Sequence, residues 1–231
     1  MNGRPLHFRL CGINNQNFIM CDEETGSWWQ QVSGKAILGE LKGVQLEAVP
    51  QDELTFTRWR FERPNGRVLR PDQQIERAGK YAKRDWEANI AKLPVVTPGV
   101  DKRLAPREVV IGVTVNGGAK AYPFGALQRQ SPIVDTIGTT PVVIVVGDDR
   151  QSVRAFTRVV DGKTLDLFAR PRSKPLVLVD ADTGTEWDFA GRALRGPYAG
   201  KQLQQVNALR DFWFDWQTYH RDTAVYTLGK R

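Results

Sequence analysis

The chain contains an internal repeat, which restricts its fold more than any other feature of the sequence. Residues 22–69 match residues 180–226 at an offset of 158 up to the pair Trp29 and Trp187, and at an offset of 157 beyond it. Thirteen positions are identical, and a change of one residue in length aligns the whole stretch. Self-similarity of this kind is typical of one structural unit that occurs twice. The sequence therefore predicts two related modules.

The two copies differ at their upstream ends. The second copy extends upstream through residues 109–160, whereas the first copy reaches Met1 before any counterpart of that stretch. We therefore expect an incomplete first module at 1–69, a linker at 70–107 and a complete second module at 108–231. Either a longer protein supplies the missing part ahead of Met1, or another surface, such as a second subunit, covers the strand edge that this part would have paired with.

Each module shows the pattern of short strands with one aromatic helix. Apolar runs bounded by turn residues predict strands at 109–115, 141–146 and 154–160. The last of these alternates, so we expect it to be half exposed. Aromatic residues at helical spacing predict a short helix that ends near Tyr219, with Asp211 as its N-cap and a counterpart around Phe56 and Trp59. We expect a β-rich α+β fold of two related β-sheet modules, each with a short aromatic helix.

The balance of charge is basic, which raises the question of an anionic partner. The chain has 33 Lys and Arg against 26 Asp and Glu, a formal net charge of +7. The stretch from Arg58 to Arg70 interleaves arginines with aromatic residues, as a groove for single-stranded nucleic acid does. An amphipathic element with a solvated charged side explains the same residues, and no nucleic-acid motif accompanies them. A basic nucleic-acid-binding module is therefore our third hypothesis, and the sequence argues against nucleic acid as the partner.

Three residues are weak candidates for a metal site. If residues 12–16 form a loop between two antiparallel strands, Cys21 lies opposite His7, and His7, Cys11 and Cys21 share one face. Two thiols and an imidazole suit copper or zinc. No fourth ligand is in view, and two cysteines without CxxC spacing make no disulfide framework. We therefore predict no cofactor, with copper or zinc as the alternative.

No catalytic constellation is visible in the sequence. The chain has no hydrolase signature of Ser, His and Asp, no HExxH motif and no dinucleotide fingerprint. It also lacks an apolar run long enough to span a membrane as a helix. Whether the protein is an enzyme stays open at this point, and a membrane span is not expected.

Several motifs, spread in order over nearly the whole chain, carry a resemblance to a known family. They are Asp22-x-x-Thr25-Gly26-Ser27-x-Trp29-x-Gln31, the glycines at 34, 39 and 43, and the segments 103–113, 119–123 and 160–162. Through them the chain resembles the bacterial and archaeal domain-of-unknown-function family 3179. The resemblance implies no established reaction. It implies an exported or envelope-associated protein, whereas the lack of a signal peptide in this chain favours the cytoplasm as the alternative.

One feature of that family has no counterpart here. Its members typically carry a Cys-Pro-x-Cys-Gly motif in the upstream half of the first module, whose thiols suit metal binding or redox chemistry. The equivalent place in the second copy, residues 146–150, contains no cysteine. The family's thiol chemistry therefore cannot be assigned to residues of this chain.

These observations lead to a first hypothesis and an alternative. The first is a non-catalytic binding or structural module of the cell envelope that holds a small ligand or a protein partner in a groove between the copies. The alternative is a fragment or paralogue of a thiol- or metal-dependent redox enzyme whose reactive motif is missing here. The candidate binding residues are Asp22, Ser27, Trp29 and Gln31, which match the family pattern near the start of one strand. A tight turn explains the same residues without a ligand.

Overall fold

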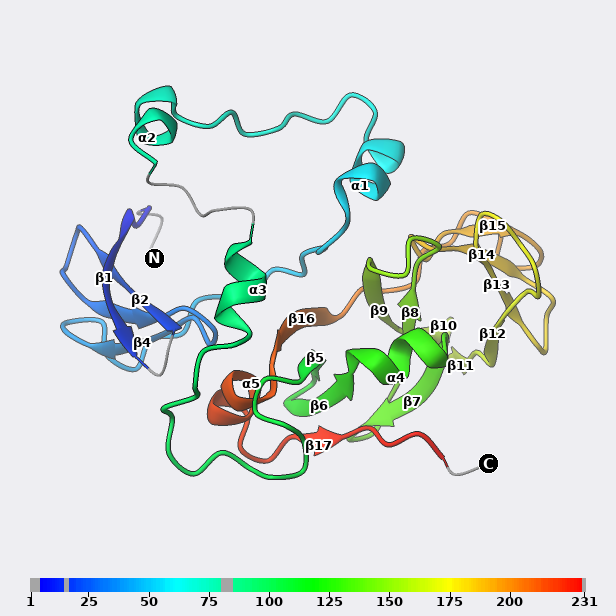
Figure 1. Ribbon diagram of the computed structural model, residues 1–231. Helices are drawn as coiled ribbons and strands as arrows, with labels where there is room; N and C mark the ends of the chain where they lie inside the picture. The colour runs from blue at the N-terminus through cyan, green and yellow to red at the C-terminus, as the bar shows by residue number, and fades with distance from the viewer. Residues whose placement is uncertain (1–4, 15–16, 80–84, 230–231) are drawn as a thin grey trace.

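The computed structural model describes residues 5–14, 17–79 and 85–229 (Figure 1). The expected start of the first module, the tip of the expected loop at 12–16 and part of the expected linker lie outside these residues. Strands hold 37% of the residues and helices 13%, in several small sheets and a few short helices. The β-rich α+β class is therefore confirmed. No helix of the described residues has the length and apolar composition that crossing a membrane requires.

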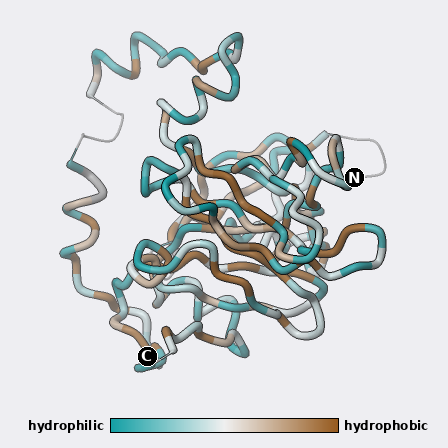
Figure 2. Tube along the Cα trace, turned by 90° about the vertical axis from the view of Figure 1, so that its right-hand side faces the viewer, coloured by the Kyte–Doolittle hydropathy of each residue, from teal (hydrophilic) through white to brown (hydrophobic). Residues whose placement is uncertain are grey.

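The first part of the chain forms an antiparallel sheet followed by three short helices. The sheet has the order β1-β2-β3-β4. Its strands are β1 (Phe8–Asn14), β2 (Asn17–Asp22), β3 (Trp28–Gln30) and β4 (Lys35–Leu38). The helices are α1 (Phe56–Glu62), α2 (Gln73–Arg77) and α3 (Trp86–Ile90). The segment from α1 to α2 loops out from the body of the protein in Figure 1 and again in the turned view of Figure 2.

The second part contains three larger sheets and a small hairpin. The first sheet, in the order β16-β5-β6-β17, joins β5 (Val109–Val115), β6 (Gly118–Pro123), β16 (Asn207–Phe212) and β17 (Ala224–Val225). The second, β7-β8-β9, joins β7 (Ile133–Ile137), β8 (Thr140–Val146) and β9 (Val153–Thr157). The third, β12-β13-β14-β15, joins β12 (Leu167–Ala169), β13 (Val177–Asp180), β14 (Glu186–Asp188) and β15 (Ala193–Arg195). The hairpin pairs β10 (Val159–Val160) with β11 (Lys163–Thr164), and the helices are α4 (Phe124–Arg129) and α5 (Trp213–Tyr219).

Strand β8 is the centre of the core because both of its faces are buried. Val142 and Ile144 pack into one apolar cluster with β5, β6 and α4, while Val143 and Val145 pack into another with the β12–β15 sheet. A strand whose side chains alternate between two buried layers must be apolar at every position, as the run at 141–146 is. Figure 2 shows these hydrophobic strands gathered in the middle of the molecule.

Three expectations for local structure were wrong. Strand β9 is buried along its whole length instead of half exposed, because Phe156 on its second face packs with the β12–β15 sheet and Arg154 on the same face is covered by Asp52 and Glu62. Asp211 lies in β16, and α5 begins after Phe212 without a side-chain cap. The repeat aligns residues 67–68 with β17 and so predicts a strand at 67–69 after α1, but these residues form none.

The β1–β4 and β12–β15 sheets make the same hydrogen bonds at aligned positions. In each sheet the aspartate that ends the second strand accepts a bond from a threonine hydroxyl three residues later, in the pairs Asp22–Thr25 and Asp180–Thr183. In each, the register shifts just before the tryptophan of the third strand. These shared contacts are what a repeated unit predicts. That the two sheets are copies of one ancestral unit stays a prediction.

Candidate functional site

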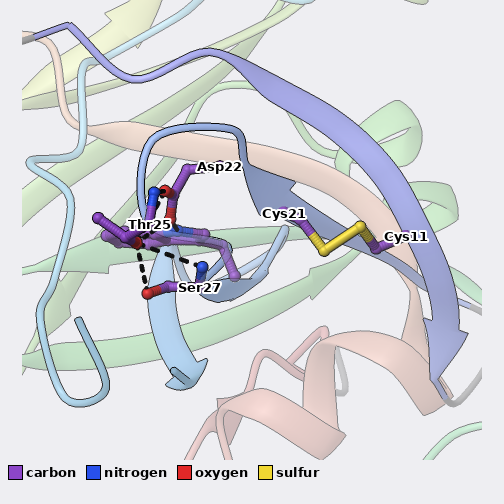
Figure 3. Close-up of a disulfide and its surroundings, with 6 residues drawn as sticks. Cys11, Cys21, Asp22, Thr25 and Ser27 are labelled. Atoms are coloured by element: carbon purple, nitrogen blue, oxygen red, sulfur yellow. Dashed lines mark hydrogen bonds between the residues drawn. A yellow bond between two sulfur atoms is a disulfide. The ribbon is translucent and has the colours of Figure 1, made fainter. Parts of the chain in front are cut away.

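Three of the four predicted binding residues lie together in a buried network at the β2–β3 turn (Figure 3). The Asp22 carboxylate accepts hydrogen bonds from the Trp29 indole N–H at 2.7 Å and from the Thr25 hydroxyl at 2.8 Å. The Thr25 hydroxyl lies 2.7 Å from the Ser27 hydroxyl oxygen, which also accepts a bond from the Leu41 backbone N–H at 3.0 Å. The network thus connects the turn to the neighbouring loop after β4.

Burial decides what this network can do. Asp22, Ser27 and Trp29 are each at most 2% exposed, whereas Gln31 is exposed in the turn after β3, apart from the others. Burial raises the pKa of Asp22, but the hydrogen bonds from Trp29 and Thr25 outweigh it and lower that pKa, so the group is an anion held by its donors. The three buried side chains hold the hairpin together, as the turn explanation requires.

The weak metal candidates do not meet as expected. Cys21 lies opposite Arg9 and not opposite His7, because the strands stay paired up to Asn14 and Asn17 in place of a loop at 12–16, and a bulge at Cys11 shifts the register by one further residue. Cys11 and Cys21 form a disulfide with a Cα–Cα distance of 5.7 Å (Figure 3), so neither sulfur is a thiolate that could bind copper or zinc. The imidazole Nδ1 of His7 lies 2.6 Å from a carboxylate oxygen of Glu24, and this hydrogen bond raises the pKa of His7. No three metal-binding side chains gather anywhere in the described residues.

A cleft of about 680 Å³ lies between α1 and the β12–β15 sheet, and we call it the α1 cleft. Sites for small ligands in proteins commonly have volumes of roughly 300–1,000 Å³. The side chains that line it are Asp52, Arg58, Phe61, Glu62, Arg63, Arg154, Pro175, Leu176, Val177, Asp188, Phe189, Ala190, Arg192, Leu194, Gln202, Leu203, Gln204 and Gln205. Four arginines and three carboxylates are among them, together with two phenylalanine rings.

Arg154 of β9 is the buried charge of the α1 cleft, at 5% exposure. Its guanidinium donates two hydrogen bonds to Asp52, at 2.9 and 2.6 Å, and two to Glu62, at 2.9 and 2.8 Å. Planar, bidentate pairs of this kind are the strongest that arginine makes with carboxylates. Burial raises the pKa values of Asp52 and Glu62, but the bonds and the charge of Arg154 outweigh it and lower both. All three groups are therefore charged at neutral pH, and Arg154 ties α1 to β9.

A second arginine connects α1 with the opposite wall. The guanidinium of Arg58 donates a bond to Glu62 at 2.7 Å and lies over the Phe189 ring at 4.5 Å from its centre. Arg154 lies over the same ring at 4.9 Å. Cation–π contacts of this length are attractive, most so where water is excluded. The Phe189 ring thereby fixes two cationic groups beside the cleft.

The chain just before α1 is anchored independently. The Thr55 hydroxyl donates a bond to Asp149 at 2.7 Å, and the Thr55 backbone N–H donates one to the Ser152 hydroxyl at 3.0 Å. Burial raises the pKa of Asp149, but the bonds from Ser152 and Thr55 outweigh it and lower the pKa to about 2. Thr55 is also the N-cap of α1, so the helix starts at a point fixed to the second part of the chain.

Two further arginines of the α1 cleft are exposed. Arg63 follows α1 directly, and among the described residues it makes no ion pair within 4 Å of a carboxylate. The guanidinium of Arg192 lies 3.9 Å from Asp188, a weak and solvent-screened distance. Both cations are therefore accessible to an anion that enters the cleft.

Sequence reasoning missed the residues that build this cleft. The alternation of 154–160 predicts a half-exposed strand and so gives no reason to expect a buried Arg154, and the stretch from Arg58 to Arg70 suggests either a nucleic-acid groove or a solvated charged side. A signal for Arg154 existed, since it is the charged residue in the apolar run of β9 and such a residue needs a buried partner. The partners Asp52 and Glu62 could not be found by pattern, because they come from a segment that was assigned to the other module.

The fold and the cleft define a β-rich protein of several small sheets in which an arginine-lined cleft lies where α1 docks on the second part of the chain. The chain belongs to a family described as "Protein of unknown function (DUF3179)", whose sequence profile matches residues 2–223. This match confirms the resemblance seen in the motifs. No curated protein and no solved structure matches the chain.

Proposed function

We propose that this protein is a non-catalytic binding protein of the cell envelope, and that the α1 cleft takes up a small organic anion with an apolar part. The observation that carries the proposal is the arrangement of its charges. The carboxylates of Asp52 and Glu62 are balanced by the two cations Arg154 and Arg58, while Arg63 and Arg192 stay accessible at the cleft. An incoming anion therefore meets a net positive site whose acidic groups are engaged.

The apolar part of the ligand follows from the rest of the lining. Phe61 is 72% exposed beside the cleft, and Leu176 and Leu203 also line it. Apolar walls with a few fixed polar groups are the usual composition of small-molecule sites. A fully hydrated ion such as sulfate would leave these walls unused, so a carboxylate or phosphate on an aromatic or aliphatic body fits better.

The disulfide supports the extracytoplasmic location. Structural disulfides form and persist in oxidising compartments and are rare in the cytosol. The Cys11–Cys21 bond joins two adjacent strands, and Cys21 is 2% exposed. The same bond weakens the redox-enzyme alternative, because both sulfurs of the described chain are engaged with each other.

Ligand titrations followed by nuclear magnetic resonance test the proposal. Phenyl phosphate and benzoate should shift the amide signals of residues that line the α1 cleft, whereas the neutral benzamide should not. Arg63→Gln and Arg192→Gln should each weaken binding about 3–10-fold, since one exposed charge-assisted hydrogen bond contributes on the order of 1 kcal/mol. Arg77→Gln on α2, outside the cleft, is the matched control. Equal shifts with benzamide, or unchanged affinity in both cleft variants, would overturn it.

A further inference from the structure

The stretch between α1 and α2, residues 63–72, leaves the body of the protein and is exposed along its whole length. In Figure 1 it runs from α1 to α2 as an open loop, and the turned view of Figure 2 shows the same loop standing clear of the body. Every residue from 63 to 72 is exposed, so no side chain of this stretch packs in a core. We call this stretch the 63–72 loop.

Two adjacent residues of the 63–72 loop are apolar. Leu69 is 94% exposed and its neighbour Val68 is 63% exposed. Single exposed apolar residues are ordinary on protein surfaces. These two, however, follow each other on a segment that projects from the body, where neither contributes to a core. Their burial therefore requires a surface from outside the loop.

The charge of the same loop is positive. It carries Arg63, Arg67 and Arg70. Its one acid is Asp72, whose carboxylate accepts hydrogen bonds from backbone N–H groups in the first turn of α2. Arg67 and Arg70 directly flank the two apolar residues, and within the described part of the chain neither makes an ion pair with a carboxylate. The loop thus presents two aliphatic side chains between two accessible cations.

We propose that the 63–72 loop binds the surface of a lipid membrane that carries anionic headgroups, with its two apolar residues in the headgroup layer and Arg67 and Arg70 on lipid phosphates. Binding of this kind adds the burial of apolar side chains to the attraction between basic residues and anionic lipids. Guanidinium groups pair with phosphate oxygens in a bidentate way, and their apolar stems lie along the boundary of the acyl chains. Complementary charge therefore favours a membrane with acidic lipids over a neutral one.

Single-stranded nucleic acid matches the same arginines less well. Proteins that hold single strands stack the bases on aromatic rings. The side chains between Arg67 and Arg70 are aliphatic, and the nearest aromatic residue along the chain, Phe61, lines the α1 cleft. Aliphatic side chains beside arginines fit a lipid interface, where they are buried against acyl chains.

Cosedimentation of the full chain with lipid vesicles tests the proposal. The chain should bind vesicles of phosphatidylcholine and phosphatidylglycerol in equal amounts and bind vesicles of phosphatidylcholine alone far more weakly. It should dissociate from the anionic vesicles as the salt concentration rises from about 50 to 500 mM. Leu69→Glu should weaken binding at least about 10-fold, because it removes apolar burial and adds a charge that the anionic surface repels. Arg67→Gln and Arg70→Gln should each weaken binding about 3–10-fold.

Two exposed residues outside the loop provide matched controls. Val49 is 76% exposed, and Arg221 is exposed in the turn after α5. Val49→Glu and Arg221→Gln therefore repeat the same kinds of change elsewhere on the surface and should leave vesicle binding unchanged. Since every altered residue is exposed, all of these variants should keep the circular dichroism spectrum of the wild type.

A fluorescent label at position 69 gives a second readout. Both cysteines of the chain form the disulfide, so Leu69→Cys introduces a free thiol for an environment-sensitive dye. The emission of this dye should move to shorter wavelength with the anionic vesicles, whereas that of a dye on Val49→Cys should not. A chain that ignores the anionic vesicles, or binds both kinds of vesicle equally, overturns the proposal. So does vesicle binding that survives Leu69→Glu, or binding of single-stranded oligonucleotides in place of vesicles.

Discussion

Replacing Arg154 by methionine should destabilise the protein through the two carboxylates that it leaves behind. Methionine keeps the volume of the stem in β9 but removes all four hydrogen bonds to Asp52 and Glu62. These acids then lie close together beside the core without a counter-ion. The cations that remain near them are Arg58, which donates to Glu62, and Arg63, whose charge helps to lower the pKa of Asp52.

The magnitude follows from how far each acid can return to water. Removing one partner of a buried ion pair costs about 3–5 kcal/mol, because a desolvated charge is left behind. The Asp52 side chain is 32% exposed and that of Glu62 is 16% exposed, so water restores part of their hydration. The segment 52–62 can also detach from β9 as a unit. We therefore expect a loss of about 3 kcal/mol in the free energy of unfolding, together with loosening of α1.

Urea denaturation followed by circular dichroism measures the loss, and hydrogen exchange of 55–62 measures the loosening. The triple variant Arg154→Met, Asp52→Asn, Glu62→Gln should recover at least half of the lost stability, since neutral amides remove the uncompensated charges. Arg195→Met should change stability far less, because Arg195 is 68% exposed and its partner Glu186 keeps a second cation, Arg170. A loss below about 0.5 kcal/mol in the single variant, or no recovery in the triple one, would refute the reasoning.

The same ion pairs predict a dependence on pH. Asp52 and Glu62 have lowered pKa values in the folded protein, against ordinary values of 3.8 and 4.5. Their contribution to stability is therefore complete above about pH 4.5 and is lost as the pH falls through the lowered values. The difference between the wild type and Arg154→Met should shrink over this acidic range.

Two further predictions concern single residues. Burial, followed by the charge of Asp215, raises the pKa of Asp211 to about 8, so the folded protein keeps a proton that the unfolded chain releases above pH 3.8. The free energy of unfolding should therefore fall between about pH 4 and pH 8. Asp211→Asn should remove this decline and raise the free energy of unfolding by on the order of 2–4 kcal/mol at pH 7. Curves of unfolding free energy against pH that run parallel for the two proteins would contradict this prediction. Gly39 has φ +95°, and a Cβ there would lie 2.7 Å from the Cα of Ser27. Gly43 has a similar φ of +90°, but a Cβ there would meet no atom within 4 Å. Gly39→Ala should therefore lower the melting temperature far more than Gly43→Ala. Equal losses of melting temperature in the two alanine variants would show that backbone strain at positive φ, and not the contact with Ser27, determines the effect.

Local patterns predicted the elements that depend on local physics. The Asn116-Gly117 turn between β5 and β6 has the positive φ values, 48° and 78°, that such a hairpin needs. The apolar run at 141–146 became the strand buried on both faces. In each case the residues that determine the structure are neighbours in the sequence.

The parts that the sequence did not reveal depend on contacts between distant residues. Arg154 meets Asp52 and Glu62 across 102 and 92 positions, and nothing near any of the three indicates the others. The disulfide was missed for a different reason. Alternation places both cysteines on one face, but a loop assumed at 12–16 puts Cys21 opposite His7, whereas the pairing of Asn14 with Asn17 and the bulge at Cys11 bring the two cysteines together.

The aligned positions of the two helix–sheet junctions explain why the arginine-lined cleft lies at α1. At the junction of α5 with β2, Asn17 donates a hydrogen bond to Asp215. The aligned residues at α1 and ahead of β13 are Arg58 and Pro175, and both line the cleft. Proline has no side-chain amide that could donate such a bond, and the arginine donates instead to Glu62 and lies over the ring of Phe189. Among the described residues no hydrogen bond joins Arg58 to Pro175, and the α1 cleft, where we propose that the ligand binds, lies at this second junction.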